Sequence, residues 1–169
     1  MAVKKIRIFG DPVLRERCIE VSKIDDSVKS LARNLTDTMK DAPGVGLAAS
    51  QIGVLRRVFV YDIGESTQVM INPIFLKKKG EIVEEEGCLS LYEIKCPVKR
   101  YQKVVVKGKN LKGEDVVVEA EDLLARVLQH EMDHIDGVLF IDRVSEKDRR
   151  KVLEAITAIQ LNAQVQGIV

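Results

Sequence analysis

Apolar residues recur every three or four positions in three segments of the chain, as they do on one face of a helix. The first segment predicts a helix with an N-cap at Ser27 and an end at Pro43-Gly44. Its apolar face would consist of Val28, Leu31, Leu35 and Met39.

The second segment, residues 121–137, predicts a largely buried helix that ends at Gly137. Two histidines, His130 and His134, join its apolar stripe and would face inward; the stripe is formed by Leu123, Leu124, Val127 and Leu128. The third segment predicts an amphipathic helix over residues 145–165. It begins with a capping box at Ser145 and Asp148, and its apolar positions are Val152, Ile156 and Ile159.

Between these helices, β-branched and aromatic residues dominate, which predicts strands. Residues 56–64 and 68–76 each predict one strand, and residues 98–121 predict a hairpin that turns near Asn110 to Gly113. We therefore expect an α+β fold, in which antiparallel strands and a hairpin pack around the buried histidine helix, with further helices at both ends. The absence of repeats and linkers predicts one domain over residues 1–169.

The composition excludes several classes of protein. The 169 residues carry a formal net charge of +1, contain no Trp and are 46% apolar. This balance offers neither a basic surface for nucleic acid nor a stacking platform for bases, and no direct nucleic-acid motif is present. No apolar run approaches a signal-peptide core or a membrane helix, so we expect a cytoplasmic protein without membrane contact. Three cysteines without a secretory signal argue against a disulfide framework.

The segment "QHEMDH" has the HExxH spacing of a catalytic metal site. On a helix, His130 and His134 would leave the same face one turn apart, and Glu131 would carry a proton. Two inward-facing core histidines satisfied by hydrogen bonds are the alternative. A catalytic zinc-type site takes three protein ligands, and the chain has only two histidines.

Three sources of a third ligand remain open from the residues alone. Glu154 on the C-terminal helix would make the site similar to that of a zinc peptidase, although a charge-rich helix usually presents such a residue to solvent. Asp136 and Asp142 lie close in sequence, but aspartates near helix ends usually cap them. Cys88 follows three glutamates, which disfavour a bare thiolate, whereas a divalent cation deprotonates a coordinating thiol. A structural metal site would need a fourth ligand, which we do not find.

Three sequence blocks resemble the signatures of peptide deformylases. They are "GVGLAASQIG" at residues 44–53, "EGCLS" at residues 86–90 and "QHEMDH" at residues 129–134, in the order and with the separations of that family. The flanking segments "FGDPVLRERCIEV" and "HIDGVLFIDRV" are also similar, so the resemblance extends from about Ile6 to Val144.

The resemblance implies that Cys88, His130 and His134 bind one divalent metal ion, Fe(II) in the cell, with zinc, nickel or cobalt as replacements in preparations. It implies removal of the N-formyl group from the initiator methionine of nascent polypeptides, with release of formate. Metal-bound hydroxide would attack the formyl carbon, with Glu131 as general base and acid. By similarity, the Gln51 side-chain amide and the Leu89 N–H would stabilise the oxyanion.

The glycine block predicts where the substrate lies. Gly44 and Gly46 allow close backbone approach, so an extended peptide could pair with this segment as an added strand; a plain turn is the alternative. Candidate residues for the methionine pocket are Val45, Leu123 and Val127, each of which could equally be ordinary core.

Three further positions bear on the resemblance, two of them by departing from the usual pattern of the family. Leu91-Tyr92 replaces an apolar residue and proline beside the expected groove. Asp122 replaces a glycine before the histidine helix and is a candidate N-cap. Lys95 stands where a basic residue often meets the peptide.

The expected partners are N-formylmethionyl nascent polypeptides. A transient contact with the ribosome would suit such an enzyme, with the basic residues Lys147, Arg149, Arg150 and Lys151 as candidates. A solvated helix face is the alternative interpretation of these residues.

Overall fold

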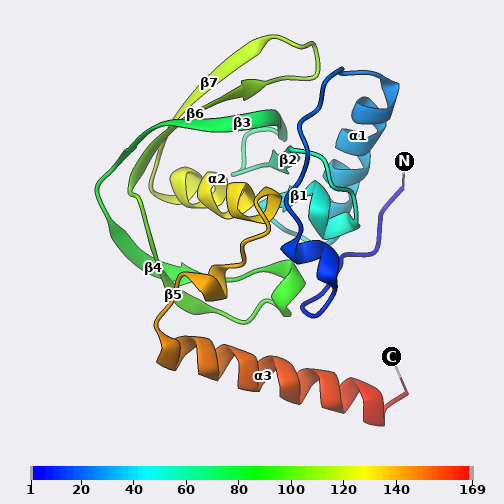
Figure 1. The fold of residues 1–169 in the computed structure, drawn as a ribbon, viewed down its shortest axis with the longest axis vertical. Helices are drawn as coiled ribbons and strands as arrows, with labels where there is room; N and C mark the ends of the chain where they lie inside the picture. The colour runs from blue at the N-terminus through cyan, green and yellow to red at the C-terminus, as the bar shows by residue number, and fades with distance from the viewer. Residues whose placement is uncertain (1, 168–169) are drawn as a thin grey trace.

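The computed structural model describes residues 2–167 (Figure 1). Its helices are α1 (Asp26–Asp41), α2 (Asp122–Ile135) and α3 (Glu146–Val165). Its strands are β1 (Gly46–Ala48), β2 (Val58–Tyr61), β3 (Gln68–Lys79), β4 (Ile82–Glu86), β5 (Cys96–Arg100), β6 (Lys103–Lys109) and β7 (Asp115–Glu121). In the described part of the chain, no helix combines the length and the apolar character that a membrane crossing requires.

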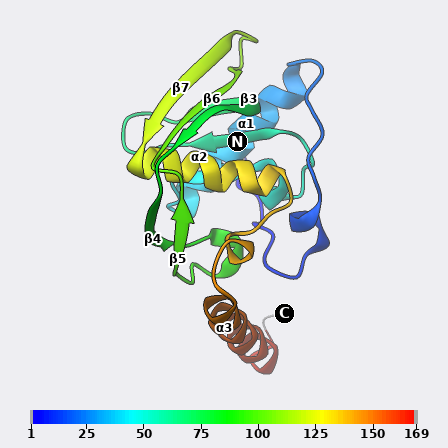
Figure 2. The same cartoon turned by 60° about the vertical axis from the view of Figure 1, so that its left-hand side comes forward.

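All strand pairs are antiparallel, and the strands form two sheets. The larger has the order β1-β2-β3-β6-β7, and the smaller consists of β4 and β5. The apolar side of α2 packs against the larger sheet through a buried cluster that includes Phe59, Met70, Val106 and Leu128. Figures 1 and 2 show α2 between the two sheets. The α+β prediction is confirmed.

The predicted hairpin over residues 98–121 is confirmed only for β6 and β7. Asn110 shapes the turn between them, since its side-chain oxygen accepts hydrogen bonds from the N–H groups of Lys112 and Glu114. Residues 98–100 belong instead to β5 and pair with β4 in the smaller sheet. The alternating pattern runs through both strands without a strong break, so it could not reveal that the chain changes sheets.

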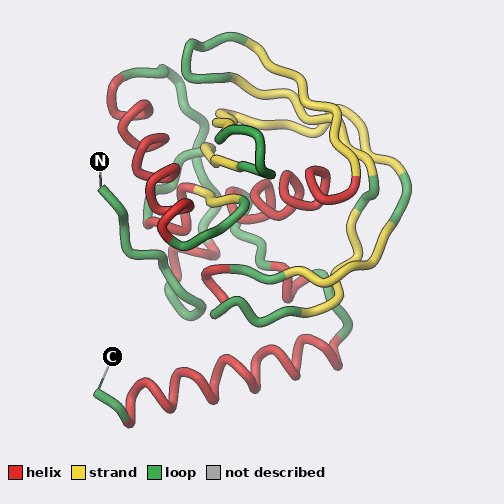
Figure 3. The backbone as a smooth tube through the Cα atoms, turned by 180° about the vertical axis from the view of Figure 1, so that it is seen from behind, coloured by secondary structure: helices red, strands yellow, loops and turns green. Residues whose placement is uncertain are grey.

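Helix α1 packs its predicted apolar face against β1 and β2. Figure 3 shows the backbone of the protein from behind, with this helix beside the larger sheet. The predicted N-cap is wrong by two positions. Asp25 is the N-cap, and its carboxylate accepts hydrogen bonds from the N–H groups of Ser27 and Val28 at 3.0 and 3.2 Å. Both residue types are favourable caps, and the carboxylate adds a negative charge at the positive end of the helix dipole.

Helix α2 begins with an unusual backbone conformation. Asp122 has φ of 50°, in the left-handed region that favours glycine, and Glu121 is the N-cap. The prediction of Asp122 as the cap is therefore wrong. The glycine expected by resemblance at this position would adopt the same conformation without strain, and aspartate is among the residues that tolerate it.

Helix α3 begins with the predicted cap, because Ser145 Oγ accepts a hydrogen bond from the Asp148 N–H at 3.1 Å. Val152 and Ile156 are buried beside the Cys88 loop in a cluster with Leu91 and Phe140. Ile159 is 37% exposed, so the predicted apolar stripe is shorter than expected. The far half of α3 extends beyond the smaller sheet (Figure 1), which leaves it fewer apolar partners.

Asp142 joins three parts of the chain. Its carboxylate accepts hydrogen bonds from Arg15, Arg149 and the Leu139 N–H at 3.2, 3.0 and 3.0 Å. Burial alone would raise the pKa of Asp142, but these donors, Arg15 first, hold the pKa below its usual value. A carboxyl whose pKa falls on folding stabilises the protein above its unfolded pKa of about 3.9. That contribution is lost as the pH falls through the folded pKa.

We expect Asp142→Asn to lower the free energy of unfolding by about 1 kcal/mol at pH 7, a value discounted for partial solvent exposure. The difference from the wild type should shrink below about pH 4. Urea unfolding at several pH values measures this change. Asp115→Asn is the control, because Asp115 pairs with the half-exposed Lys107 and Lys109, where solvent screens the charge, so the change in stability should be smaller. A difference for Asp142→Asn that stays constant with pH would contradict the prediction.

Candidate metal centre

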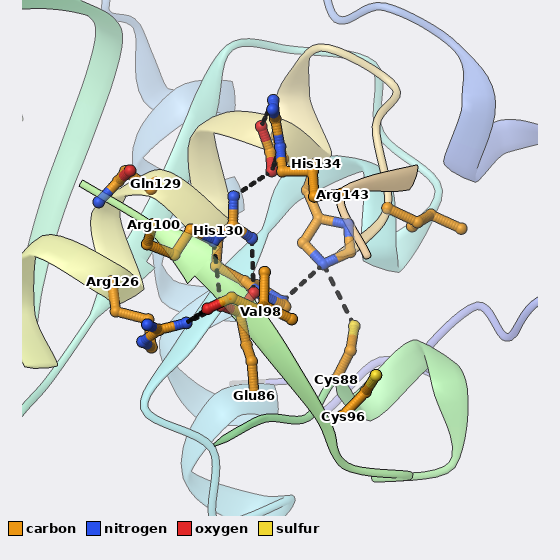
Figure 4. Close-up of polar contacts among 12 residues, drawn as sticks. Glu86, Cys88, Cys96, Val98, Arg100, Arg126, Gln129, His130, His134 and Arg143 are labelled. Atoms are coloured by element: carbon orange, nitrogen blue, oxygen red, sulfur yellow. Dashed lines mark hydrogen bonds and ion pairs between the residues drawn. The ribbon is translucent and has the colours of Figure 1, made fainter. Parts of the chain in front are cut away.

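Three side chains bring their donor atoms together: Cys88, His130 and His134, whose donors all lie within 4.8 Å of one another. Cys88 Sγ is 3.3 Å from His134 Nε2, and that nitrogen is 3.1 Å from His130 Nε2 (Figure 4). The structure thus assembles the donor set expected from the sequence.

Two elements position these donors. His130 and His134 are one turn apart on α2, so both rings leave the same face of the helix. Cys88 lies two residues after the end of β4, at the N-cap of a short 3₁₀ helix (Leu89–Leu91). Burial of Cys88 and Leu91 with Val98 and Phe140 holds this loop under α2.

The donor geometry fits a divalent ion. Zinc bonds of about 2.0–2.1 Å to nitrogen and 2.3 Å to sulfur place tetrahedral donors about 3.3–3.6 Å apart. Two of the three separations, 3.1 and 3.3 Å, are close to this spacing, and the third does not exceed 4.8 Å. Burial lowers the pKa of His134, which favours the neutral imidazole that metals bind. One thiolate and two imidazoles suit zinc and iron alike.

Glu86 completes the centre, and sequence reasoning missed its role. Its carboxylate lies 2.5 Å from His130 Nδ1. Arg100 donates two hydrogen bonds to it, at 3.0 and 2.5 Å, and Arg126 donates one at 2.9 Å. Burial alone would raise the pKa of Glu86, but the hydrogen bonds from His130 and Arg100 outweigh it and hold the pKa well below its usual range.

An ionised Glu86 determines which ring nitrogen of His130 faces the centre. A carboxylate only accepts hydrogen bonds, so His130 Nδ1 carries a hydrogen and Nε2 is the ring nitrogen left to bind a metal ion. In the sequence Glu86 was one of three consecutive glutamates. Its position in "EGCLS", two residues before the cysteine, was the one signal that set it apart.

Arg100 extends this network away from the donors. Its third nitrogen donates to Asp133 at 2.6 Å, and Arg143 donates two further hydrogen bonds of 2.6 Å to the same carboxylate. The buried carboxylates Glu86 and Asp133 are therefore both paired, as buried charges must be.

Glu131 is 3% exposed and lies on the wall of the cavity beside the donors. Within residues 2–167, its Oε2 atom has no hydrogen-bond partner. Burial raises the pKa of Glu131 to about 7. An unpartnered buried carboxylate beside three convergent donors fits a water molecule bound at the centre, and a pKa near neutrality suits proton transfer.

Gln51 and Leu89 flank Cys88. Gln51 Oε1 accepts a hydrogen bond from the Ala48 N–H at 2.9 Å, which turns the amide nitrogen toward the centre. That nitrogen lies 3.1 Å from Ser90 Oγ and 3.8 Å from Cys88 Sγ. Leu89 directly follows Cys88, and both Gln51 and Leu89 line the cavity.

A cavity of about 390 Å³ opens beside the donors and is lined by Cys88 and His130 among others. All the residues expected to bind substrate line it: Gly44, Val45, Gly46, Leu123 and Val127. Val45 and Leu123 are half exposed at 48% and 53%, whereas Val127 is buried, so the apolar wall reaches from the rim to the interior.

The segment after "EGCLS" borders the cavity differently from the prediction. Leu91 is fully buried in the core, and Glu93 and Lys95 supply the lining instead of Leu91-Tyr92. Tyr92 and Glu93 have φ of 56° and 58°. Two successive left-handed residues turn the chain sharply, which the residue types did not indicate.

The structure brings none of the alternative ligands to the centre. Glu154 is exposed on the outer face of α3. Asp136 pairs with Arg57 at 2.7 Å, and Asp142 pairs with Arg15 and Arg149. Among the described residues, the candidate metal group consists of Cys88, His130 and His134.

Comparisons with known proteins agree with this geometry. The polypeptide deformylase family matches residues 3–150. A peptide deformylase from Clostridium botulinum is 50% identical over 147 residues, which cover 87% of this chain and the whole of the relative. One from Acidothermus cellulolyticus is 49% identical over 92% of this chain and 87% of its own length.

The crystal structure of a peptide deformylase from Legionella pneumophila superposes with a TM-score of 0.91 at 38% identity, and the match covers 98% of both chains. The agreement in sequence and fold spans the three signature blocks and the candidate metal centre. This chain belongs to the peptide deformylase family.

Proposed function

We propose that the peptide deformylase activity of this chain acts on the N-formyl group of the initiator methionine of newly made polypeptides and releases formate. The observation that carries the proposal is that a Cys-His-His donor set and the buried carboxylate of Glu131, whose Oε2 has no hydrogen-bond partner among the described residues, lie together beside one cavity. A divalent ion held by Cys88, His130 and His134 would act as a Lewis acid and lower the pKa of a water to about 7.

Glu131 would carry the proton of the reaction. Its Oε2 has no hydrogen-bond partner among the described residues, and its raised pKa would allow it to accept a proton and then release it. It would take the proton from the water and deliver it to the leaving amine nitrogen. The Gln51 amide and the Leu89 N–H would donate hydrogen bonds to the oxyanion that develops on the formyl oxygen.

The substrate peptide would lie along β1. This strand is an edge of the larger sheet, so its backbone can pair with an added strand. The methionine side chain would enter the apolar part of the cavity formed by Val45, Leu123 and Val127.

The same proposal includes Fe(II) as the metal in the cell, replaceable by zinc, nickel or cobalt, and a cytoplasmic location. It treats residues 1–169 as one catalytic domain with a C-terminal helix; Met1 and residues 168–169 lie outside the described structure. The donor set supports one divalent ion, and its softness is compatible with iron or zinc.

A transient ribosome contact would use α3. The family match ends at residue 150, in the first turns of this helix, so most of α3 is additional to the matched region. Lys147, Arg150 and Lys151 are exposed there and could meet ribosomal phosphates. Arg149 is partly buried and paired with Asp142, so it is the least available of the four predicted residues.

Release of formate from formyl-Met-Ala-Ser tests the proposed reaction. The protein loaded with Fe(II) under anaerobic conditions, or with Co(II) or Ni(II), should release one formate per free amino terminus formed. A metal-loaded protein that leaves the formyl peptide intact would contradict the proposal.

Gly46→Ala tests the position of Glu131. A Cβ at Gly46 would lie 2.9 Å from the carboxyl carbon of Glu131, too close for a real contact. The carboxylate must then move from the place where it would meet the water, and we expect kcat to fall about 10²-fold, as for other small misplacements of reacting groups. Steady-state kinetics on formyl-Met-Ala-Ser measure this loss.

The same substitution in a Glu131→Ala background provides the control. With the carboxylate removed there is nothing to displace, so Gly46→Ala should cost little further activity. Equal losses in both backgrounds would show that Gly46 acts through the peptide groove instead of through Glu131.

A further inference from the structure

Arg126 lies on α2 one turn before His130 and two turns before His134, so all three side chains leave the same face of the helix. It is only 5% exposed. The reaction described above gives this buried guanidinium no part, and burying it demands partners.

The contacts of Arg126 reach both strands of the smaller sheet (Figure 4). Its Nη1 donates to Glu86 Oε2 and to the Val98 carbonyl, both at 2.9 Å. Its Nη2 donates to the Ile82 carbonyl at 3.3 Å, and Nε lies 3.6 Å from a Glu84 oxygen. One side chain of the histidine helix is thus tied to the first and last residues of β4 and to the middle of β5.

Arg100 shares Glu86 but cannot replace Arg126. The hydrogen bonds of Arg100 go to the Glu86 and Asp133 side chains, which can turn about their own bonds. Arg126 also bonds two backbone carbonyls, so it sets the place of the strands themselves. Cys88 follows β4 by two residues, so any shift of β4 relative to α2 moves the sulfur relative to the imidazoles.

We propose that Arg126 is a positioning residue of the metal centre. It holds the β4–β5 sheet, and with it Cys88, in a fixed place relative to His130 and His134, and it helps to keep Glu86 against His130 Nδ1. The inference rests on the Cys-His-His ligand set of the proposed function. It extends to a residue that touches neither the metal nor the reacting atoms.

Arg126→Met tests this role, because methionine keeps apolar bulk and removes the hydrogen-bond fork. We expect the dissociation constant for Zn²⁺, measured by competition with a coloured chelator, to rise about 10–100-fold, as for other residues that orient metal ligands. The absorption bands of the Co(II) protein should shift, since they report ligand geometry. Arg15→Met is the matched control: it removes another ion-paired guanidinium, on Asp142, and should change Zn²⁺ affinity less than about twofold.

Unchanged Zn²⁺ affinity and Co(II) bands in folded Arg126→Met would overturn the proposal, even if the protein melted at a lower temperature. If Arg126→Met does not fold, Arg126→Gln, which keeps one amide donor, is measured in the same way. Unchanged Zn²⁺ affinity in Arg126→Gln would also overturn the proposal. A wild-type protein that binds Zn²⁺ but releases no formate with any metal would overturn the proposed function alone.

Discussion

Glu131→Gln is expected to lower kcat for formyl-Met-Ala-Ser by about 10²–10⁴-fold, the usual contribution of general acid–base catalysis. Glutamine keeps the size of the side chain, but its amide can neither accept the water's proton nor protonate the amine. Glu131 is 3% exposed, and its Oε2 atom has no hydrogen-bond partner among the described residues, so the carboxylate is free to hold the water's proton.

The metal content of Glu131→Gln shows whether its lower kcat results from the missing carboxylate or from loss of the metal ion. Glu131 is not one of the three convergent donors, so Glu131→Gln should bind the ion as the wild type does. Metal content by atomic absorption and kcat are measured on the same sample. Full turnover in a metal-loaded Glu131→Gln protein would refute the role of Glu131.

Cys88→Ala is expected to abolish stable metal binding and, with it, activity. The two imidazoles that remain cannot complete a three-ligand site. We expect metal affinity to fall more than about 100-fold, beyond the 10–100-fold loss that follows removal of an outer-sphere partner. In the Co(II) protein, the near-ultraviolet charge-transfer band from sulfur should disappear.

Glu154→Ala is the matched control for Cys88→Ala, because it removes the ligand that a peptidase-like site would use. Glu154 is exposed on the outer face of α3. We therefore expect Glu154→Ala to retain both the metal and the activity. Loss of metal in this variant, with metal retained in Cys88→Ala, would reverse the assignment of the third ligand.

The sequence predicts the structure best where the residues that form the pattern all lie in one helix or strand. The spacing of His130 and His134 already defined a shared helix face, and the helical period predicted α1 and α2. The residue types predict the ends of helices less well. Asp25 and Ser27 are both favourable N-caps, so the sequence does not show which of them begins α1. Residues 98–121 were predicted as one hairpin, but they belong to two sheets. In the structure β6 pairs with β7, whereas β5 pairs with β4.

The third ligand shows the limit of local reasoning. Because a divalent cation deprotonates a coordinating thiol, Cys88 is a plausible third ligand, but the residue types by themselves do not exclude Glu154. The three family motifs together favour Cys88. Sequence separation says little about distance once strands and helices pack, because contact depends on how the elements are arranged.

The sequence by itself determined the helix face with both histidines, the proton carrier beside them and, through the resemblance, the family. Only the tertiary structure decided which of three consecutive glutamates supports His130, and that Arg126 ties α2 to the β4–β5 sheet. It also decided that Gly46 lies against Glu131. The physical reason is that helical periodicity is a local property of the backbone, whereas burial, pairing and pKa depend on residues that only the folded chain brings together.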